Sequence, residues 1–303
     1  MKKILIVGAN GFTGRQILND LSIYKSYKVT GCSLHSDILS DESAGYHFVE
    51  TDIRNEGNVK RLFKEVQPDV VINCSALSMP DYCETHHEEA YLTNVTAVAR
   101  LADLCEEYKS RFIHLSTDFV FDGKINENLG LLYTEKHLPA PVNYYGYTKW
   151  KGEEKVAEIC SSYAIVRVEI VYGKALPGQH GNIVQLVMNR LKAGQEIRVV
   201  SDQWRTPTYV GDVSDGVQRL VEHTMNGIFH ICGDECMTIA EIAYQVADCM
   251  GLNRSLIHPA TTEEMNETTP RPRFSGMSIH KARTMLGYEP RKLKEILLNW
   301  DHL

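Results

Sequence analysis

The feature that most constrains the fold is a glycine-rich turn near the N-terminus, Gly8-x-x-Gly11-x-x-Gly14. The apolar run at residues 4–7 predicts a strand buried on both faces, and the apolar spacing within residues 15–21 predicts a helix after the turn. Such a turn suits phosphate binding, because glycines let the backbone approach closely and the helix N-terminus presents free N–H groups to an anion. We therefore expect the pyrophosphate of a dinucleotide at this turn.

The first half of the chain repeats this pattern of strand and helix. Strands that alternate with helices predict an α/β fold with a doubly wound parallel sheet, whose ligands lie at the carboxyl ends of the strands. The predicted strands lie at residues 27–32, 46–50, 69–76 and 111–115, and the predicted helices at residues 56–66 and 94–108.

The alternation weakens from residue 168 onward, and the loops become longer. We expect residues 1–167 to form a Rossmann-like NAD(P)-binding domain, rejoined by about residues 208–233. Residues 168–207 and 234–303 then form a smaller substrate-binding region. The second half is predicted to contain helices at 182–191 and 237–249, a strand at 227–233, a loop at 202–209 that enters the site, and a surface loop at 261–270.

Charge and cysteine usage narrow the class of protein. The net charge of −7 and the isoelectric point near 6.0 argue against nucleic acid as a partner. The eight scattered cysteines indicate reduced thiols in a cytoplasmic protein, and Cys232 and Cys236 are the only close pair, so no metal site is predicted. No apolar stretch reaches membrane-spanning length, so no membrane partner is expected.

The residues that carry chemistry follow the predicted strand at 111–115. Ser116 and Thr117 stand at its carboxyl end, and downstream Tyr145 and Lys149 are four residues apart, hence on one face of a helix. A tyrosine that shuttles protons at neutral pH needs its pKa lowered by roughly 3 units, about 4 kcal/mol. A neighbouring ammonium group and a positively charged nicotinamide act in that direction.

The end of the second predicted strand bears on the choice of dinucleotide. An acid at this position would bind the ribose hydroxyl and favour NAD, but the chain has Ser33 and His35 here and no acid before Asp37. Small polar side chains can accommodate a 2′-phosphate, so NADP is favoured and NAD is left open. Ser75 and Ala76, which end the fourth strand, are small enough for the nicotinamide ribose to pass close to the backbone.

Together, these motifs resemble the dTDP-4-dehydrorhamnose reductase family, within the extended short-chain dehydrogenase/reductase superfamily. The glycine spacing is that of the superfamily, and the resemblance covers nearly the whole chain. The motifs are Ser-Thr-Asp-Phe-Val-Phe-Asp-Gly from Ser116, Tyr-Gly-x-Thr-Lys from Tyr145, Val171-Tyr172-Gly173, Asp202-Gln203-x-x-x-Pro207-Thr208 and Arg271-Pro272-x-x-Ser275.

The resemblance implies reduction of a 4-keto sugar carried on a nucleotide. Tyr145 would donate a proton to the ketone oxygen, Lys149 would lower the pKa of Tyr145 and hold the nicotinamide ribose, and Thr117 would hydrogen-bond the substrate oxygen. The cofactor would deliver hydride to C4 of the sugar. The cofactor residues are expected to be Gly8, Asn10, Gly11, Phe12, Thr13, Gly14, Ser33, His35, Asp52, Ile53, Ser75, Ala76, Tyr145 and Lys149, and the substrate residues Ser78, Thr117, Asp118, Arg205 and Arg271.

Two of these assignments have an alternative. The resemblance places Asp52 and Ile53 beside the adenine, and a cap for the helix at 56–66 is an equal interpretation of Asp52 that is compatible with that place. Arg205 could clamp a diphosphate, because its planar fork matches phosphate oxygens, or it could be an arginine of a surface loop.

The sugar pocket departs from the family pattern, so the sugar itself is left open. The reductases carry a tryptophan where this chain has Arg167-Val168-Glu169-Ile170, and Ser78-Met79-Pro80-Asp81 and Gly276-Met277 also differ. Phe119 stands where dehydratases need a base, which disfavours dehydration. The alternatives are an epimerase or a reductase of another nucleotide-sugar, or a non-catalytic regulatory subunit like the β subunit of methionine adenosyltransferase. The resemblance also allows a homodimer.

Overall fold

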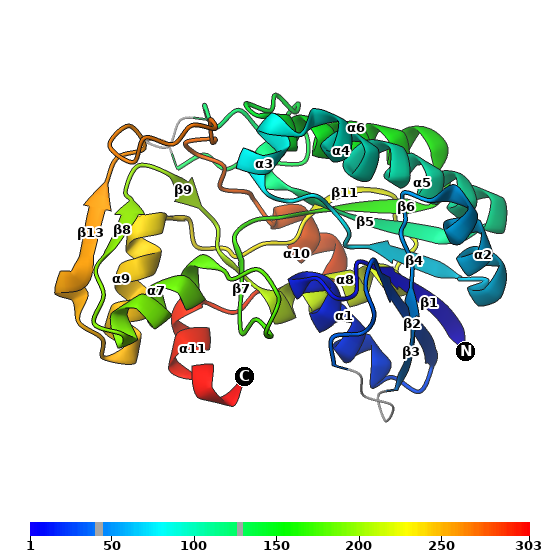
Figure 1. Cartoon of the computed structure of the whole chain (residues 1–303), viewed down its shortest axis with the longest axis horizontal. Helices are drawn as coiled ribbons and strands as arrows, with labels where there is room; N and C mark the ends of the chain where they lie inside the picture. The colour runs from blue at the N-terminus through cyan, green and yellow to red at the C-terminus, as the bar shows by residue number, and fades with distance from the viewer. Residues whose placement is uncertain (40–44, 126–129) are drawn as a thin grey trace.

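The computed structural model, which describes residues 1–39, 45–125 and 130–303, is built on a parallel sheet of seven strands in the order β11-β6-β5-β4-β1-β2-β3 (Figure 1). The order reverses next to β1, where a doubly wound sheet opens a crevice for ligands. The predicted α/β class is confirmed. The strands are β1 (Lys2–Val7), β2 (Tyr27–Ser33), β3 (Tyr46–Glu50), β4 (Val70–Asn73), β5 (Arg111–Thr117), β6 (Tyr163–Val168) and β11 (Gly227–His230).

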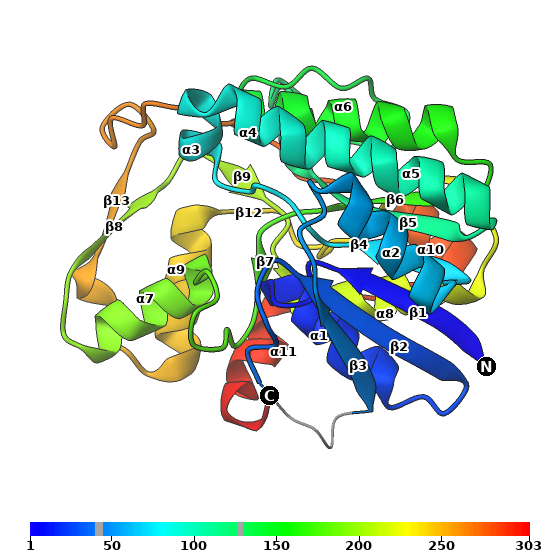
Figure 2. The ribbon, with the colours of Figure 1, turned by 45° about the vertical axis from the view of Figure 1, so that its right-hand side comes forward.

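Helices cover both faces of this sheet, and each face has its own apolar core (Figures 1 and 2). Burial on both sides explains why the central strands carry continuous apolar runs, such as residues 4–7 of β1 and 70–72 of β4. One face carries α1 (Phe12–Ser22), α8 (Val210–Glu222) and α10 (His280–Leu286), and the other carries α2 (Glu56–Val66), α5 (Ala97–Tyr108) and α6 (Tyr144–Ile159).

Helix α2 shows how the local sequence sets these elements. It begins after Asn55, whose side chain accepts the N–H of Asn58, and it buries an apolar stripe against the sheet. The alternative role of Asp52 as the cap of this helix is therefore wrong. Asp52 instead binds Arg54, with its Oδ1 2.9 Å from the guanidinium Nε.

The helix predicted at 94–108 is interrupted at its start. The chain passes through α3 (Pro80–Thr85) and α4 (His87–Tyr91) into a π-helical turn, η1 (Leu92–Thr96), before α5 begins. The wide turn places the side chain of Asn94 inside the molecule, where it bonds both the N–H and the carbonyl of Leu77 and also the hydroxyl of Thr148. Single π turns of this kind recur at functional sites.

A third apolar core lies beside the sheet, around α7 (Ile183–Lys192), α9 (Ile239–Met250) and α11 (Leu293–Leu298) (Figure 2). Thr238 caps α9 in a capping box with Glu241. The segment expected to be a loop at 202–209 contains two short strands, each paired with a partner. β9 (Trp204–Arg205) pairs with β12 (Met237–Thr238), and β10 (Thr208–Tyr209) pairs with β7 (Val171–Tyr172). A further pair outside this segment joins β8 (Ile197–Val200) to β13 (Ile257–Ala260).

All eight cysteines are free thiols, and most of them are buried. Within residues 1–39, 45–125 and 130–303, no helix is long and apolar enough to cross a membrane.

Candidate functional site

The glycine turn at the end of β1 has the shape that a phosphate needs. Gly8 has a φ of +79°, and a Cβ there would lie 2.7 Å from the backbone nitrogen of Ser75. A Cβ on Gly14 would overlap the carbonyl oxygen of Gly8. Helix α1 begins after Gly11 with no side-chain cap, so its first N–H groups are free to bind an anion.

Two adjoining cavities open at this turn. The first, of about 290 Å³, lies over the ends of β2 and β3, and the second, of about 420 Å³, runs from the turn to α6. The hydroxyl group of Ser116 borders the second cavity, is buried, and has no hydrogen-bond partner among the described residues. The paired cavities, the free N–H groups and this unpartnered hydroxyl group fit an extended dinucleotide. Both cavities are lined by Gly11, Cys74, Ala76 and Leu77.

Tyr145 and Lys149 lie in the first half of α6 and border the second cavity. The Lys149 ammonium donates to the carbonyl of Leu115, 2.7 Å away, at the end of β5. The Thr117 hydroxyl group hydrogen-bonds the Tyr145 phenol. Gly146 permits this arrangement, because a Cβ there would overlap the carbonyl of Phe119.

Burial controls the ionisation of both side chains. It raises the pKa of Tyr145 above its usual range, and it lowers the pKa of Lys149 to about 8. The lowered pKa expected for Tyr145 is not found in the protein alone, because desolvation by burial is the largest effect on the phenol. A phenol that stays protonated is the form that can donate a proton.

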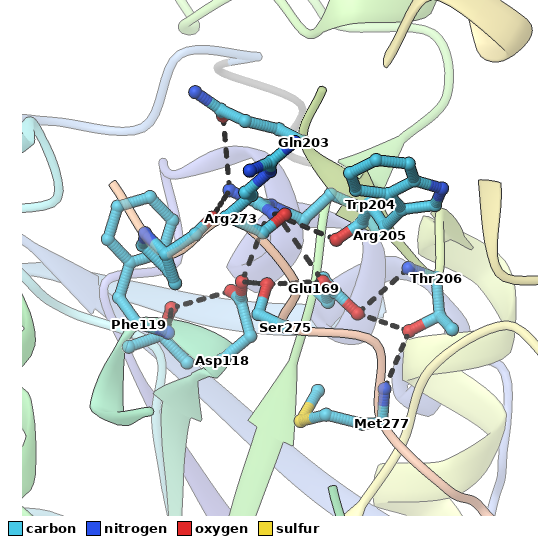
Figure 3. A network of polar contacts seen from close by, with 12 residues as sticks. Asp118, Phe119, Glu169, Gln203, Trp204, Arg205, Thr206, Arg273, Ser275 and Met277 are labelled. Carbon is cyan, nitrogen blue, oxygen red and sulfur yellow. Dashed lines mark hydrogen bonds and ion pairs between the residues drawn. The ribbon is translucent and has the colours of Figure 1, made fainter. Parts of the chain in front are cut away.

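A buried polar network lies behind Thr117 (Figure 3). The Ser275 hydroxyl group contacts Asp118 and Glu169, and the Arg205 guanidinium lies between the same two carboxyl groups. Arg205 is 2% exposed, and its terminal nitrogens bind the carbonyls of Trp204 and of Pro272 and the side chain of Gln203.

Both expectations for Arg205 therefore need correction. Arg205 is not an arginine of a surface loop, because it is buried. Its guanidinium is not open to a diphosphate, because its N–H groups already bind acceptors inside the protein. Asp118, expected to bind substrate, is likewise buried and turned toward Ser275 and Thr117.

A third cavity, of about 470 Å³, lies between α7 and β8. Phe119 lies at its edge, and the same ring packs edge-on against Tyr145 with the ring centroids 5.6 Å apart. Arg190, Arg198 and Arg271 also line this cavity. Glu196 and Glu267 lie beside these arginines, and Glu267 pairs with Arg271. Phe119 joins this cavity to the phenol that borders the second.

Most of the expected site residues line one or two of the three cavities. Those at the first cavity are Gly8, Gly11, Ser33, Asp52, Ile53, Ser75 and Ala76; those at the second are Asn10, Gly11, Phe12, Thr13, Gly14, Ala76, Ser78, Tyr145 and Lys149; and those at the third are Arg205 and Arg271. Thr117 and Asp118 are buried behind the second cavity, and the exposed side chain of His35 lies outside all three.

The structure adds residues that the sequence analysis missed. Arg54 borders the first cavity and supplies the cation that the stretch around Ser33 lacks. Asn94 anchors the segment between β4 and α6, and Glu169 joins the network behind Thr117. Gln179 lines the second cavity and donates to the backbone oxygen of Asn10. Of these four residues, only Arg54 carried a signal in the sequence, because it lies two positions after Asp52.

Comparison with known proteins gives a consistent result. Residues 1–300 match the family described as RmlD substrate binding domain. The chain is 31% identical to the spore coat polysaccharide biosynthesis protein SpsK of Bacillus subtilis, over 98% of this chain and 96% of that protein. It is 32% identical to methionine adenosyltransferase 2 subunit beta of Xenopus laevis, over 89% and 78% of the two chains. The structure of dTDP-4-dehydrorhamnose reductase from Bacillus anthracis in complex with NADP superposes with a TM-score of 0.86, at 27% identity, over 100% and 99% of the chains.

Proposed function

The chain belongs to the RmlD substrate binding domain family, and on that premise we propose that it reduces dTDP-4-dehydro-L-rhamnose to dTDP-L-rhamnose with NAD(P)H. The family and the similar structures support an NAD(P)-dependent oxidoreductase that acts on a sugar. One observation carries the finer proposal. A protonated tyrosine and a lysine border one cavity with the glycine turn, and a second cavity lined by arginines and Phe119 adjoins that tyrosine.

Three side chains perform the protein's part of the reduction. Tyr145 donates its phenolic proton to the ketone oxygen, and its raised pKa keeps that proton in place until the oxygen becomes basic. Lys149 is held 2.7 Å from the carbonyl of Leu115, and its remaining ammonium hydrogens are available to a ribose and to the phenolate that forms. Thr117 orients the phenol. A bound nicotinamide supplies the hydride for C4.

The third cavity suits the nucleotide part of the substrate. Arg190 and Arg198 offer planar guanidinium groups of the kind that bind diphosphate oxygens, and Phe119 offers an aromatic face. Arg271 also lines the cavity and is held by Asp81 and Glu267. Phe119 also lies against Tyr145, so a nucleotide in the third cavity would place its sugar near the proton donor. This arrangement favours a nucleotide-linked sugar over a free sugar.

For the cofactor we propose NADPH. Ser33 and Arg54 border the same cavity at the end of β2, and the Arg54 side chain is about one-third exposed. A guanidinium in this position can neutralise a 2′-phosphate. Asp52 binds Arg54 with its Oδ2 2.9 Å from Nη2, which holds the guanidinium in place.

A second candidate is a regulatory subunit without turnover. Two observations favour it: the similarity to the methionine adenosyltransferase subunits, and the absence of an aromatic residue from Arg167 to Ile170. Such a subunit would bind the dinucleotide but would not oxidise it when given a keto sugar.

The test is a turnover assay with enzymatically prepared dTDP-4-dehydro-L-rhamnose. NADPH and NADH consumption is followed by absorbance, and the sugar product is identified by NMR. Formation of dTDP-L-rhamnose, faster with NADPH than with NADH, is expected. Protein that binds NADPH without consuming it would contradict the reductase and favour the regulatory subunit.

A further inference from the structure

Asp118 and Glu169 are two carboxylic acids buried together behind Thr117. Their side chains are 5% and 0% exposed. Among the residues that the structure describes, Arg205 is the one cation within 4 Å of either group, with its Nε 3.7 Å from Asp118 Oδ2 and 3.8 Å from Glu169 Oε1. Two carboxylates and one guanidinium would leave a net negative charge in the interior. Such a charge is costly unless a proton neutralises it.

The position of Ser275 independently requires a proton on one of the carboxyl groups (Figure 3). Its Oγ lies 2.6 Å from Asp118 Oδ2 and 2.8 Å from Glu169 Oε1. A serine hydroxyl group carries one hydrogen, so it can donate to only one of these oxygens. The other contact is a hydrogen bond only if that carboxyl group carries a hydrogen of its own.

We propose that Asp118, Ser275 and Glu169 share one proton, carried by Glu169 at rest, and that Glu169 is thereby a positioning residue for Thr117 and Tyr145. The hydrogen bonds that the two carboxyl groups accept indicate that Glu169 carries the proton. Both oxygens of Asp118 accept, Oδ1 from Thr117 and Oδ2 from Ser275. Glu169 Oε2 accepts from the backbone N–H and the hydroxyl group of Thr206, which leaves Oε1 to carry the hydrogen toward Ser275.

The surrounding charges support this assignment. Burial and the nearby Asp118 carboxylate raise the pKa of Glu169 to about 8, although Arg205 acts in the opposite direction. The Cys232 and Cys236 thiols and the Tyr145 phenol also face the pair, and burial raises the pKa of each of them. They therefore stay neutral at pH 7. Glu169 is accordingly the group of this cluster that releases a proton as the pH rises through about 8.

Movement of the shared proton can transfer the negative charge from Asp118 to Glu169 during the reaction. This role rests on the proposed function. When Tyr145 gives up its proton, a phenolate forms close to the Asp118 carboxylate. The Glu169 Oε1–H bond then breaks as its proton passes to Ser275 Oγ, while the Ser275 hydrogen passes to Asp118 Oδ2. No proton is gained or lost, but the negative charge moves from Asp118 to Glu169. Thr117 can then turn its hydroxyl hydrogen from Asp118 to the phenolate.

Infrared spectroscopy in D2O tests the shared proton without any substrate. We expect the carbonyl band of a protonated carboxylic acid at pH 7 that disappears as the pH rises through about 8, the value to which the pKa of Glu169 is raised. Glu169→Gln should abolish this band. Asp118→Asn should abolish it as well, because Arg205 then balances a single carboxylate. Glu158→Gln, at an exposed carboxylate bound to Lys155, is the control and should leave the band unchanged.

A band missing from wild-type protein, or one that persists in Glu169→Gln or in Asp118→Asn, would overturn the shared proton.

Kinetics of Ser275→Ala test the positioning role. The proton transfer through Ser275 takes place only when the phenolate forms. In Ser275→Ala, kcat should therefore fall roughly tenfold while KM changes by less than about twofold. An unchanged kcat would overturn that role. If no keto sugar is turned over at all, the proposed function fails and the infrared result still decides the shared proton.

Discussion

Lys149 shows how burial decides chemistry at the scale of one side chain. Its pKa is lowered to about 8 by desolvation, which outweighs the Glu153 carboxylate and the Cys74 thiol. The ammonium is therefore present below pH 8 and is lost as the pH rises through that value. It sits at the end of β5 because the Leu115 carbonyl and the helical spacing from Tyr145 hold it there.

The first prediction is an alkaline fall in activity. We expect kcat to decline above pH 8 as Lys149 loses its proton, and Lys149→Met to lower kcat by about 10² or more at pH 7. Lys151→Met, at a partly exposed lysine of the same helix bound to Glu154, should keep wild-type kcat. An alkaline fall that is absent from the wild-type profile up to pH 10 would contradict this account of Lys149.

The second prediction concerns Arg54. Replacing Arg54 with Ala should raise KM for NADPH about tenfold or more and leave KM for NADH nearly unchanged, because only NADPH carries the 2′-phosphate. Arg61→Ala, at an exposed position of α2, controls for the loss of a surface charge. Equal changes in KM for NADPH and for NADH would contradict this role, and would indicate that Arg54 positions Asp52 without distinguishing the two cofactors.

At the scale of elements, the turn between β1 and α1 depends on glycine for two separate reasons. Gly8 needs a positive φ, and Gly14 needs the space that its missing Cβ leaves next to the Gly8 carbonyl. A side chain at either position would push α1 away from the strand end. The free N–H groups of the helix would then no longer point into the cavity.

The third prediction follows from this packing. We expect Gly14→Ala to abolish NADPH binding in isothermal calorimetry, while Gly57→Ala retains wild-type affinity. Gly57 lies in the first turn of α2, where a Cβ would meet only an ordinary contact with Asn55 and alanine favours the helix. Wild-type NADPH affinity in Gly14→Ala would show that the turn does not hold the pyrophosphate.

What the sequence predicts well is local in the chain. The strand, glycine turn and helix at the N-terminus and the spacing of Tyr145 and Lys149 are set by neighbours within a few residues, and both appear in the structure. The network behind Thr117 could not be predicted, because Glu169, Arg205 and Ser275 come from three distant segments. Likewise, the pKa of Tyr145 depends on burial, which no spacing of residues reveals.

At the scale of the whole molecule, the cofactor cavities lie on the sheet, whereas the third cavity is formed largely by the region with its own apolar core. Phe119 links the two parts, since it borders the third cavity and packs against Tyr145. Two ligands could therefore bind separately yet meet at one tyrosine. This division explains how one chain can hold both a dinucleotide and a nucleotide-sugar.

The fourth prediction tests this division by thermal unfolding. NADPH and dTDP should each raise Tm, and their effects should add when both are present, because each ligand stabilises the folded state through its own site. Gly14→Ala should lose the NADPH shift and keep the dTDP shift. Competition between the two ligands would place them in one cavity and contradict the assignment.

The measurement that tests the central claim most directly compares wild type with Tyr145→Phe. Both proteins are mixed with NADPH and dTDP-4-dehydro-L-rhamnose, and NADPH oxidation is followed in a single turnover after NADPH binding has been shown for each. The account predicts oxidation by wild type and at least about a 10³-fold slower rate in Tyr145→Phe, because the ketone oxygen loses its proton donor. Equal rates in the two proteins would contradict Tyr145 as the donor, and no oxidation by either would contradict the reductase.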